Sequence, residues 1–399
     1  MARDSGSSRI MTATMTGADS IIELVRDAAA VETPLRVSGR GCWIDAGRPV
    51  DATRIASLAA HSGVVDYVPG DLTMTVRSGT TLGEIADLTG AEGQWLPLDP
   101  FGPREGTIGA TIATGSFGPL AHSFGRARDL VLGVEFVTGD AKAVRGGGRV
   151  VKNVAGFDLV RLITGSWGTL GIITEATLRL YSKPSHTVTL SLGAPDGVTA
   201  LSHRIASVFS APGIAFAVEM VDAGIATKLG LSAKLQLLVR LGGNAAAVTA
   251  QRAAIESLGG AHEVDPTVWD RLRAIEDSQH DDWESAPAPI VVRISSLPQR
   301  VALLWTDARN AVTGIDGAMM HATPSLGVVR CILPPATPML FLERLANASP
   351  GATIIYERLP SHLWPMLSPS IVTDRISQGI KKAFDPSNIL NPGILGSAT

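Results

Sequence analysis

The first helix of the chain is predicted by apolar residues at helical spacing. Ile22, Val25 and Ala29 would share one face of a helix over residues 19–30, with Asp19 as its capping residue. We therefore expect the ordered chain to begin at this helix. Residues 34–55 then predict a short strand, a glycine loop and a second short strand.

Alternating apolar and polar positions predict further strands before residue 184. A strand is predicted around residues 74–76, and a helix follows from about residue 81 to residue 90, a glycine of the kind that ends helices. Residues 129–137 and 171–180 alternate as half-buried strands do.

Beyond residue 184 a strand followed by a helix recurs. Residues 235–264 and 290–312 both show this plan, and residues 317–333 add two more strands. The pattern favours an α+β layer, a sheet with helices on one face. We expect three parts, over residues 19–184, 185–370 and 371–399, the last a helix and a proline-containing tail.

Composition narrows the classes of protein that fit. The 399 residues allow two domains, and a formal net charge of -3 gives no basic footprint for nucleic acid. Two cysteines, Cys42 and Cys331, are too few for a disulfide framework and favour a reducing compartment. The N-terminal stretch has no apolar run like that of a signal peptide, and nowhere do about 18 apolar residues follow one another. We expect a cytoplasmic protein.

Glycines are concentrated between residues 98 and 177. So many positions without side chains predict a backbone that approaches a large, flat cofactor closely. The earlier loop Ser38–Gly41 follows a short strand but lacks the dinucleotide fingerprint, because position 44 is Ile and no helix follows at once. A nicotinamide-binding Rossmann domain is therefore disfavoured. The loop is either an anion nest for a pyrophosphate, helped by Arg36, Arg40 and Arg48, or an ordinary turn.

Seven motifs carry a resemblance to a known family. They are PLRVSGRG, YVPGDLTMTV, GQWLPLDP, TIGATIATGSFGP, GRARDLVLGVEFVTG, VVKNVAGFDLVRLITGSWGTLGIITEATLRL and FDPSNILNPG. In order and spacing they resemble the FAD-binding module of the vanillyl-alcohol oxidase superfamily, and within it the GlcE-type FAD-binding subunits of bacterial glycolate oxidase. The resemblance implies a PCMH-type two-subdomain FAD-binding fold, a smaller ferredoxin-like α+β domain and a C-terminal tail that returns to the flavin.

The resemblance also implies which residues hold FAD. The pyrophosphate loop would be Ser38, Gly39, Arg40, Gly41 and Cys42, with Pro69, Gly70 and Asp71 in the turn beside it. The isoalloxazine and ribityl portion would lie against Leu98, Asp99, Pro100, Thr107, Ile108, Gly109, Ala110, Ala113, Thr114 and Gly115, with Gly125, Arg128 and Asp129 completing that wall. The adenosine side would be Gly165, Ser166, Gly168, Gly171, Ile172 and Ile173, and Asn391 would reach the flavin edge.

Some of these residues have a structural alternative. Asp129 and Asp158 could instead bond local backbone amides. Some superfamily members carry a histidine covalently bonded to the flavin near the position of Cys42, but no histidine lies between Arg36 and Arg48. We therefore expect FAD to be bound without a covalent link.

A flavin enzyme that oxidises a 2-hydroxy acid needs a cation for the carboxylate and a base for the hydroxyl proton. Candidates in the second domain are Arg293, Arg330 and His321, followed by Tyr356, Arg358 and His362. The arginines could instead be solvated strand residues, and His321 could be a loop or core histidine.

Related catalytic subunits carry the metal-binding motif G-H-x-G-D-G-N-x-H. This motif is absent from the sequence, so we expect no metal site.

The resemblance therefore implies that the chain works beside a second, FAD-containing catalytic subunit and an iron–sulfur subunit, with peripheral membrane association only through such partners. Three functions remain open. The first is the FAD-binding subunit of a glycolate oxidase complex that oxidises glycolate to glyoxylate. The second is a self-sufficient FAD-dependent dehydrogenase of another 2-hydroxy acid such as D-lactate. The third is a flavin-bearing subunit for electron relay or assembly, without turnover of its own.

Overall fold

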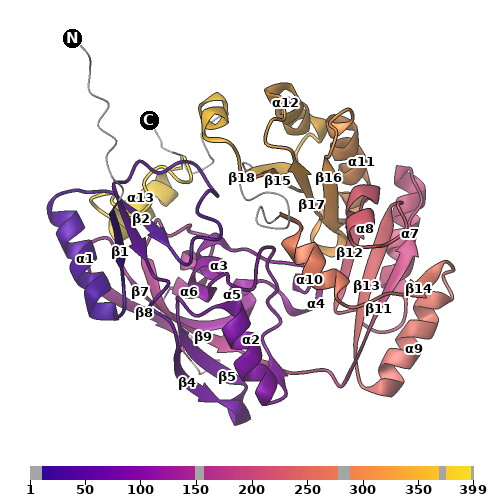
Figure 1. Cartoon of the computed structure of the whole chain (residues 1–399), viewed down its shortest axis with the longest axis horizontal. Coiled ribbons are helices and arrows are strands. Elements are labelled where there is room, and N and C mark those ends of the chain that lie inside the picture. The colour runs from indigo at the N-terminus through magenta and orange to yellow at the C-terminus, as the bar shows by residue number, and fades with distance from the viewer. Residues whose placement is uncertain (1–10, 149–156, 277–287, 368–373, 397–399) are drawn as a thin grey trace.

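The computed structural model describes residues 11–148, 157–276, 288–367 and 374–396. Within these residues the strands form four sheets. The first part of the chain, at the left of Figure 1, contains a three-stranded, a five-stranded and a two-stranded sheet, and an eight-stranded sheet stands at the right.

The three-stranded sheet is parallel and has the order β1-β3-β2. Its strands are β1 (Met11–Thr14), β2 (Leu35–Ser38) and β3 (Arg54–Ser57), and α1 (Ala18–Ala30) follows β1. The helix is present, but its buried face is formed by Ile21, Leu24, Val25 and Ala28, so of the predicted stripe only Val25 is fully buried, while Ile22 and Ala29 are half-buried. The capping residue is Gly17, and Asp19 lies in the first turn. The expectation that order begins at this helix is wrong. Strand β1 precedes it, and because four residues show no clear period, only their pairing with β3 defines the strand.

The five-stranded sheet is antiparallel, in the order β4-β5-β9-β7-β8. Its strands are β4 (Val64–Val68), β5 (Thr73–Arg77), β7 (Val131–Val137), β8 (Ala143–Gly147) and β9 (Ile172–Arg179). Helices on or beside it are α2 (Leu82–Ala91), α3 (Ile108–Thr114), α4 (Ala121–Phe124), α5 (Ala127–Leu130) and α6 (Leu159–Ile163). Helix α2 begins with a capping box, in which Thr81 Oγ1 accepts from the Glu84 amide and Glu84 accepts from the Thr81 amide.

Two short strands, β6 (Gln94–Trp95) and β10 (Tyr181–Ser182), pair just before the chain enters the eight-stranded sheet. That sheet has the order β14-β11-β13-β12-β16-β17-β15-β18. Its strands are β11 (His186–Gly193), β12 (Ala217–Val221), β13 (Gln236–Gly243), β14 (Ala261–Glu263), β15 (Ile290–Ser295), β16 (Met319–Thr323), β17 (Val328–Leu333) and β18 (Thr353–Arg358).

The eight-stranded sheet consists of two βαββαβ units joined edge to edge by β12 and β16. The helices between strands are α7 (Val198–Ser210), α8 (Ala223–Lys228), α9 (Ala245–Glu256), α10 (Val268–Arg273), α11 (Val301–Val312) and α12 (Met339–Ala348). Helices α7, α9, α11 and α12 cover one face and share one apolar core with it. The four longer helices thus lie on one face, as predicted. The prediction is wrong for the opposite face, because the short helices α8 and α10 pack there together with Phe101 and Leu120 from the first part of the chain.

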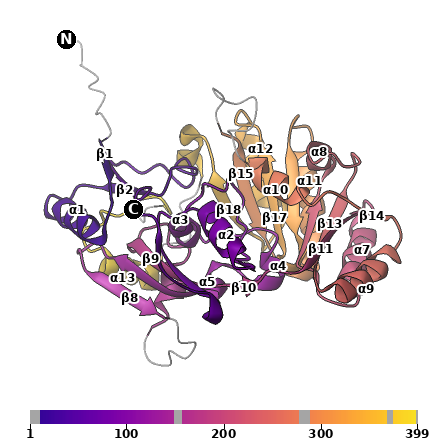
Figure 2. The ribbon, with the colours of Figure 1, turned by 60° about the horizontal axis from the view of Figure 1, so that its bottom comes forward.

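The C-terminal segment returns to the first part of the chain. Helix α13 (Arg375–Phe384), drawn in yellow, lies among the indigo and magenta strands in Figures 1 and 2. The tail after it hydrogen-bonds β2, because the Leu35 amide donates to Ile389 and the Asn391 amide donates to Leu35. Buried Asp385 accepts from the amides of Ile389 and Leu390 and so fixes the turn between helix and tail.

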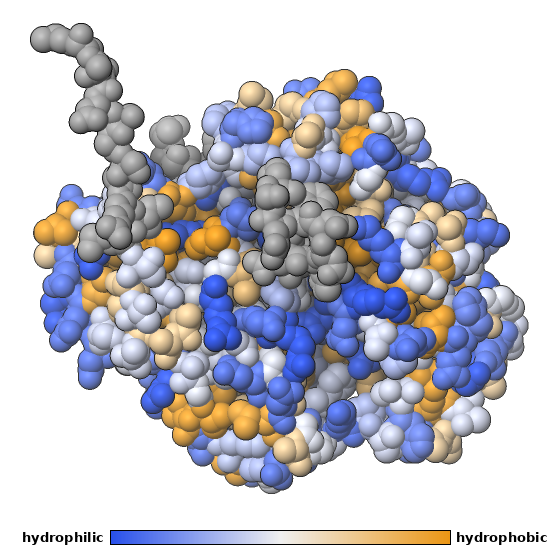
Figure 3. Space-filling view, viewed as in Figure 1, coloured by the Kyte–Doolittle hydropathy of each residue, from blue (hydrophilic) through white to orange (hydrophobic). Residues whose placement is uncertain are grey.

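The surface seen in Figure 3 mixes hydrophilic and hydrophobic residues, and hydrophilic residues gather in the middle of the view, between the two halves of the molecule. Among the described residues, no helix has both the length and the apolar character needed to cross a bilayer.

Candidate functional site

A cleft lies between the loop after β2, helix α3 and the turn before β9. Of the residues predicted to hold FAD, fifteen line it: Ser38, Gly39, Arg40, Gly41, Cys42, Pro100, Thr107, Gly109, Ala110, Ala113, Thr114, Gly168, Gly171, Ile173 and Asn391. They come from segments up to some 350 positions apart in the sequence, and the fold brings them to one cavity.

The loop after β2 has the features of an anion nest. Gly41 has φ +85°, and the amides of Arg40 and Gly41 donate to no acceptor among the described residues. Arg36 also lines the cleft, and one nitrogen of its guanidinium donates to the carbonyls of Ile44 and Ala46. Arg48 donates to the carbonyl of Trp364. The exposed Arg40 side chain is a further cation beside the two open amides, and this combination suits a diphosphate.

Helix α3 forms the wall across from this loop. Thr107 caps it by accepting from the Ala110 amide at 3.4 Å, and the Gly109 amide donates to the Ser78 carbonyl at 2.9 Å. A Cβ at Gly109 would lie 2.6 Å from the Ser78 Cβ, so this glycine is required by contact with the turn behind the helix. A Cβ at Gly39 would overlap the Thr107 hydroxyl, so the bare backbone of the loop touches the Thr107 side chain at the start of the helix.

The C-terminal tail closes the cleft through Asn391. Its side-chain oxygen accepts from the Val37 amide at 2.8 Å, and its nitrogen donates to the Trp167 carbonyl at 2.8 Å. Asn391 is 2% exposed and therefore acts as a clamp between two walls. A Cβ at Gly168 would lie 2.9 Å from the Asn391 nitrogen, which accounts for that glycine.

Other predicted FAD residues do not line the cleft, and each has a local role. Pro69, Gly70 and Asp71 form the 3-10 turn η1 between β4 and β5, where the Pro69 carbonyl accepts from Gln94. Leu98, Ile108 and Ile172 are buried in apolar cores. Gly165 and Ser166 form the turn after α6, whose Gly165 amide donates to Ile112. Gly115 ends α3 with φ +65°.

The segment from Gly125 to Asp129 is also structural. Asp129 accepts from the Arg126 amide at 2.8 Å and so caps α5, and a Cβ at Gly125 would clash with its carboxylate. Arg128 lies 3.9 Å from Asp129. Asp158 similarly caps α6 through the Arg161 amide. The structural alternative therefore holds for both aspartates.

Asp99 was expected at the flavin and is instead buried beneath the loop that lines the cleft. Its carboxylate accepts from the Leu120 amide at 3.1 Å. Burial raises the pKa of Asp99 to about 7, although Arg273 and Arg240 oppose the shift.

A second, smaller hollow opens from the cleft toward the eight-stranded sheet, and we call it the substrate hollow after the role proposed for it below. Trp43, Phe101, Thr114, Ser116 and Trp167 line both cavities. Arg293, Arg330 and Glu357 lie on its far side, together with Gly115 and Phe117. Arg293 thus extends from β15 toward the first part of the chain, beside Phe117.

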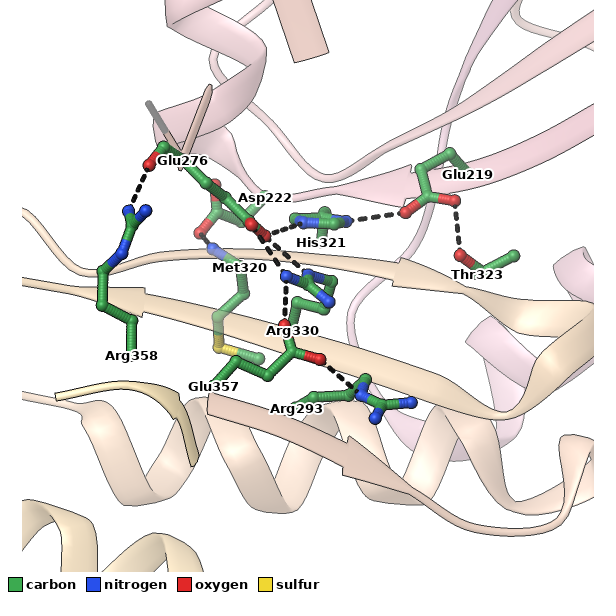
Figure 4. Close-up of polar contacts among 10 residues, drawn as sticks. All are labelled: Glu219, Asp222, Glu276, Arg293, Met320, His321, Thr323, Arg330, Glu357 and Arg358. Carbon is green, nitrogen blue, oxygen red and sulfur yellow. Dashed lines mark hydrogen bonds and ion pairs between the residues drawn. The ribbon is translucent and has the colours of Figure 1, made fainter. Parts of the chain in front are cut away.

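A chain of alternating charges extends from the substrate hollow into the sheet (Figure 4). Arg293 lies 2.7 Å and Arg330 2.6 Å from the Glu357 carboxylate. Arg330 also donates to both oxygens of Glu276, at 2.6 and 2.7 Å. His321 follows, 3.4 Å from Glu276 and 2.7 Å from Glu219, which accepts from Thr323.

Mutual attraction stabilises these buried charges. Burial alone would lower the pKa of Arg330, but the carboxylates of Glu276 and Glu357 raise it above its ordinary value. Burial would raise the pKa of Glu276, and Arg330 and His321 lower it to about 2. For His321, burial lowers the pKa, but hydrogen bonds to Glu219 and Glu276 outweigh burial and the pKa is raised. Arg330 and Glu276 are therefore both charged at neutral pH.

The three predicted catalytic residues thus have different surroundings. Arg293 borders the substrate hollow and has one carboxylate neighbour. Arg330 also borders it, but its guanidinium is shared between two carboxylates. His321 is 0% exposed, has both ring nitrogens engaged, and lies behind Phe101 at 4.5 Å between ring centroids. It is a core histidine, and the expectation of a substrate-contacting His321 fails because no side of its ring faces the substrate hollow.

Of the further candidates, Arg358 lies over the Trp43 ring and 3.0 Å from Asp45, so it links the loop after β2 to strand β18. Tyr356 packs against the core of the eight-stranded sheet, and His362 is exposed. The sequence analysis missed Glu219, Glu276 and Glu357. A signal existed for Glu219, a single charged residue in the apolar strand AVEMV, since such a residue is buried only with a partner.

One predicted motif falls partly outside the described residues. VVKNVAGFDLVRLITGSWGTLGIITEATLRL begins within residues 149–156. In the ranges that are described, no three His, Cys, Asp or Glu side chains are grouped as metal ligands would be.

Comparison with known proteins agrees with this geometry. Residues 11–147 match the family described as FAD binding domain. The chain is 39% identical to glycolate oxidase subunit GlcE of Escherichia coli, over 43% of this chain and 49% of that protein. It is 30% identical to glycolate oxidase subunit GlcD of Bacillus subtilis, over 56% of this chain and 50% of that protein. The chain therefore spans about half the length of these relatives.

Among solved structures, p-cresol methylhydroxylase superposes with a TM-score of 0.72, over 96% of this chain and 88% of that one, at 17% identity. This similarity shows the fold, which is the PCMH-type fold expected from the sequence. Residues 11–147, which match the FAD binding domain, contribute the loop after β2 and helix α3 to the cleft.

Proposed function

We propose that this chain, whose residues 11–147 form an FAD-binding domain, takes part in the FAD-dependent oxidation of a small 2-hydroxy acid. The observation that carries the proposal is the substrate hollow. It shares five residues with the cofactor cleft and has two arginines on its far side. A carboxylate bound there would lie next to the flavin end of the cleft.

In the proposed reaction the 2-hydroxy acid loses two protons and two electrons and becomes the 2-oxo acid, with FAD as the electron acceptor. Arg293 would bind the substrate carboxylate, because its guanidinium borders the hollow and is paired on one side only. Arg330 would hold Glu357 in place, and Glu357 is the carboxylate positioned to accept the hydroxyl proton. Phe101, Phe117 and Trp167 restrict the hollow to a small substrate.

FAD would be held without a covalent link, by the open amides of Arg40 and Gly41, the Arg40 side chain and the wall formed by α3. Glycolate is the substrate we propose, with glyoxylate as product, because the two relatives above are named as glycolate oxidase subunits. For the same reason we propose a second FAD-containing subunit and an iron–sulfur subunit as partners, which would receive the electrons.

The test is anaerobic addition of glycolate, and separately of D-lactate, to the purified FAD-loaded chain, followed by flavin absorbance. The same additions are then made to the chain combined with its proposed partners. Bleaching by glycolate supports the proposal, and bleaching without partners identifies a self-sufficient dehydrogenase. A flavin that stays oxidised in both settings would contradict it and leave electron relay or assembly as the role.

A further inference from the structure

Phe117 has two guanidinium groups against its ring, one from each half of the molecule. The Arg126 guanidinium carbon lies 4.4 Å from the ring centroid, and that of Arg293 lies 5.7 Å from it. Phe117 is 4% exposed and lines the substrate hollow. Arg126 follows Gly125 immediately before α5 and was not among the predicted site residues.

The other cationic side chains around the substrate hollow are each matched by a carboxylate. Arg293 lies against Glu357, Arg330 against Glu276, His321 against Glu219, and Arg358 against Asp45. When His321 is protonated, each pair holds one positive and one negative charge, so the four pairs together carry no net charge. The net charge around the substrate hollow therefore depends on the charged side chains beside these pairs.

Arg126 differs from these four cations. It has no carboxylate within ion-pairing distance among the described residues, whereas its neighbour Arg128 lies 3.9 Å from Asp129. Burial lowers the pKa of Arg126, the positive charges of Arg293 and Arg128 lower it further, and Asp129 offsets part of this shift. Because Glu357 already pairs with Arg293, the charge of Arg126 is left over, and it favours binding of an anion.

We propose that Arg126 supplies the unbalanced positive charge of the substrate hollow and thereby selects a carboxylate anion as its ligand. The proposal rests on the function proposed above, since it takes this hollow as the substrate site. Arg126 acts by electrostatic attraction across the Phe117 ring and is a positioning residue for the substrate. Arg293 provides the direct contact.

The test measures anion binding without turnover. Oxalate, an unreactive small dicarboxylate, is titrated into the FAD-loaded full chain while the flavin absorbance is followed. We expect Arg126→Gln to raise the oxalate Kd about tenfold at low ionic strength, and the difference to shrink in about 1 M salt, where charges are screened within about 3 Å. Arg126→Lys keeps the charge and should retain most of the affinity.

The matched control is Arg252→Gln, which removes an exposed arginine of α9 that pairs with Glu256 and Glu263, and it should leave the oxalate Kd unchanged. Bound FAD per chain is measured for every variant, so that a folding defect is recognised. Wild-type affinity in Arg126→Gln would overturn the inference. So would an Arg126→Lys variant as weak as Arg126→Gln, since that would mean packing and not charge. If the wild-type chain itself binds no oxalate, glycolate or D-lactate, the proposed function fails as well.

Discussion

Gly109 illustrates how a residue can line a cofactor cleft and yet be required for another reason. The glycine-rich sequence suggests that any side chain there would enter the cofactor bed. In the structure the missing Cβ points at the Ser78 turn, at 2.6 Å from the Ser78 Cβ and 2.9 Å from its carbonyl oxygen. The glycine lets helix α3 approach the end of β5, and the cleft depends on that approach.

We therefore expect Gly109→Ala to lower the free energy of unfolding by about 1–3 kcal/mol, because an added methyl overpacks a close contact. Urea unfolding of the FAD-free chain measures it. Gly90→Ala is the matched control: Gly90 lies in α2 with nothing within 4 Å of its added Cβ. There alanine should stabilise by up to about 1 kcal/mol through helix propensity. Equal effects of both substitutions would contradict the contact with Ser78.

At the scale of elements, one short turn joins three strands of the eight-stranded sheet. The turn η2 (Ala274–Glu276) follows α10 and carries Glu276, which is fully buried. Its carboxylate accepts a hydrogen bond from Arg330 of β17 and lies 3.4 Å from His321 of β16. Its backbone carbonyl accepts a hydrogen bond from Arg358 of β18 at 2.9 Å. The position of Arg330 at the substrate hollow thus depends on this turn.

Glu276→Gln should lower the free energy of unfolding by about 3–5 kcal/mol at neutral pH, because it leaves part of a buried ion pair uncompensated.

The pH dependence of stability follows from the same group. The pKa of Glu276 in the folded protein, about 2, lies below its ordinary value of 4.5. The carboxylate therefore stabilises the protein fully above about pH 4.5, and this stabilisation declines as the pH falls toward 2. Urea unfolding at neutral and acidic pH measures both effects. The control Glu256→Gln removes an exposed partner of Arg252 and should cost at most about 1 kcal/mol. A neutral Glu276→Gln would mean that the charge chain is dispensable.

At the scale of the whole molecule, the loop that lines the cleft also joins the two halves. The Gly102 amide donates to the Arg273 carbonyl at 2.7 Å, and the Arg273 guanidinium donates to the Pro100 carbonyl at 3.0 Å. Phe101 between them lies on both His321 and Arg330. Asp99 is buried at the base of this loop, next to charges of the eight-stranded sheet. One short segment, residues 99–102, therefore fixes the position of the cleft relative to the substrate hollow.

The raised pKa of Asp99 makes this junction sensitive to pH. The unfolded carboxyl titrates near 3.8 and the folded one near 7, so the folded state binds the proton more tightly and stability falls as the pH rises from about 4 to about 7. Asp99→Asn should reduce that fall by up to about 4 kcal/mol, since the amide oxygen can still accept from Leu120. Urea unfolding across this pH range measures it. The same slope in both proteins would contradict the assignment.

Much of the fold follows from local pattern, as α2 shows. The helix predicted from about residue 81 begins at Leu82, and the strands at 131–137 and 172–179 lie where alternation places them. The resemblance to a flavin family led to fifteen residues that do line the cleft. It also assigned to the cleft residues such as Ile108 and Asp129, because a motif specifies backbone course more closely than the direction of each side chain. Ile108 points into the core, and Asp129 toward the amide it caps.

By itself the sequence determined where many of the longer strands and helices form, that glycine-rich segments allow close backbone contacts, and that Arg293 and Arg330 belong to strands. Those properties depend on neighbours a few positions away. Only the tertiary structure decided that Glu276 and Glu357 neutralise Arg330, that His321 is enclosed, and that Arg126 meets Arg293 across Phe117. These contacts join residues from separate strands and turns, so they exist only once strand order and sheet packing have placed the side chains within a few ångströms of one another.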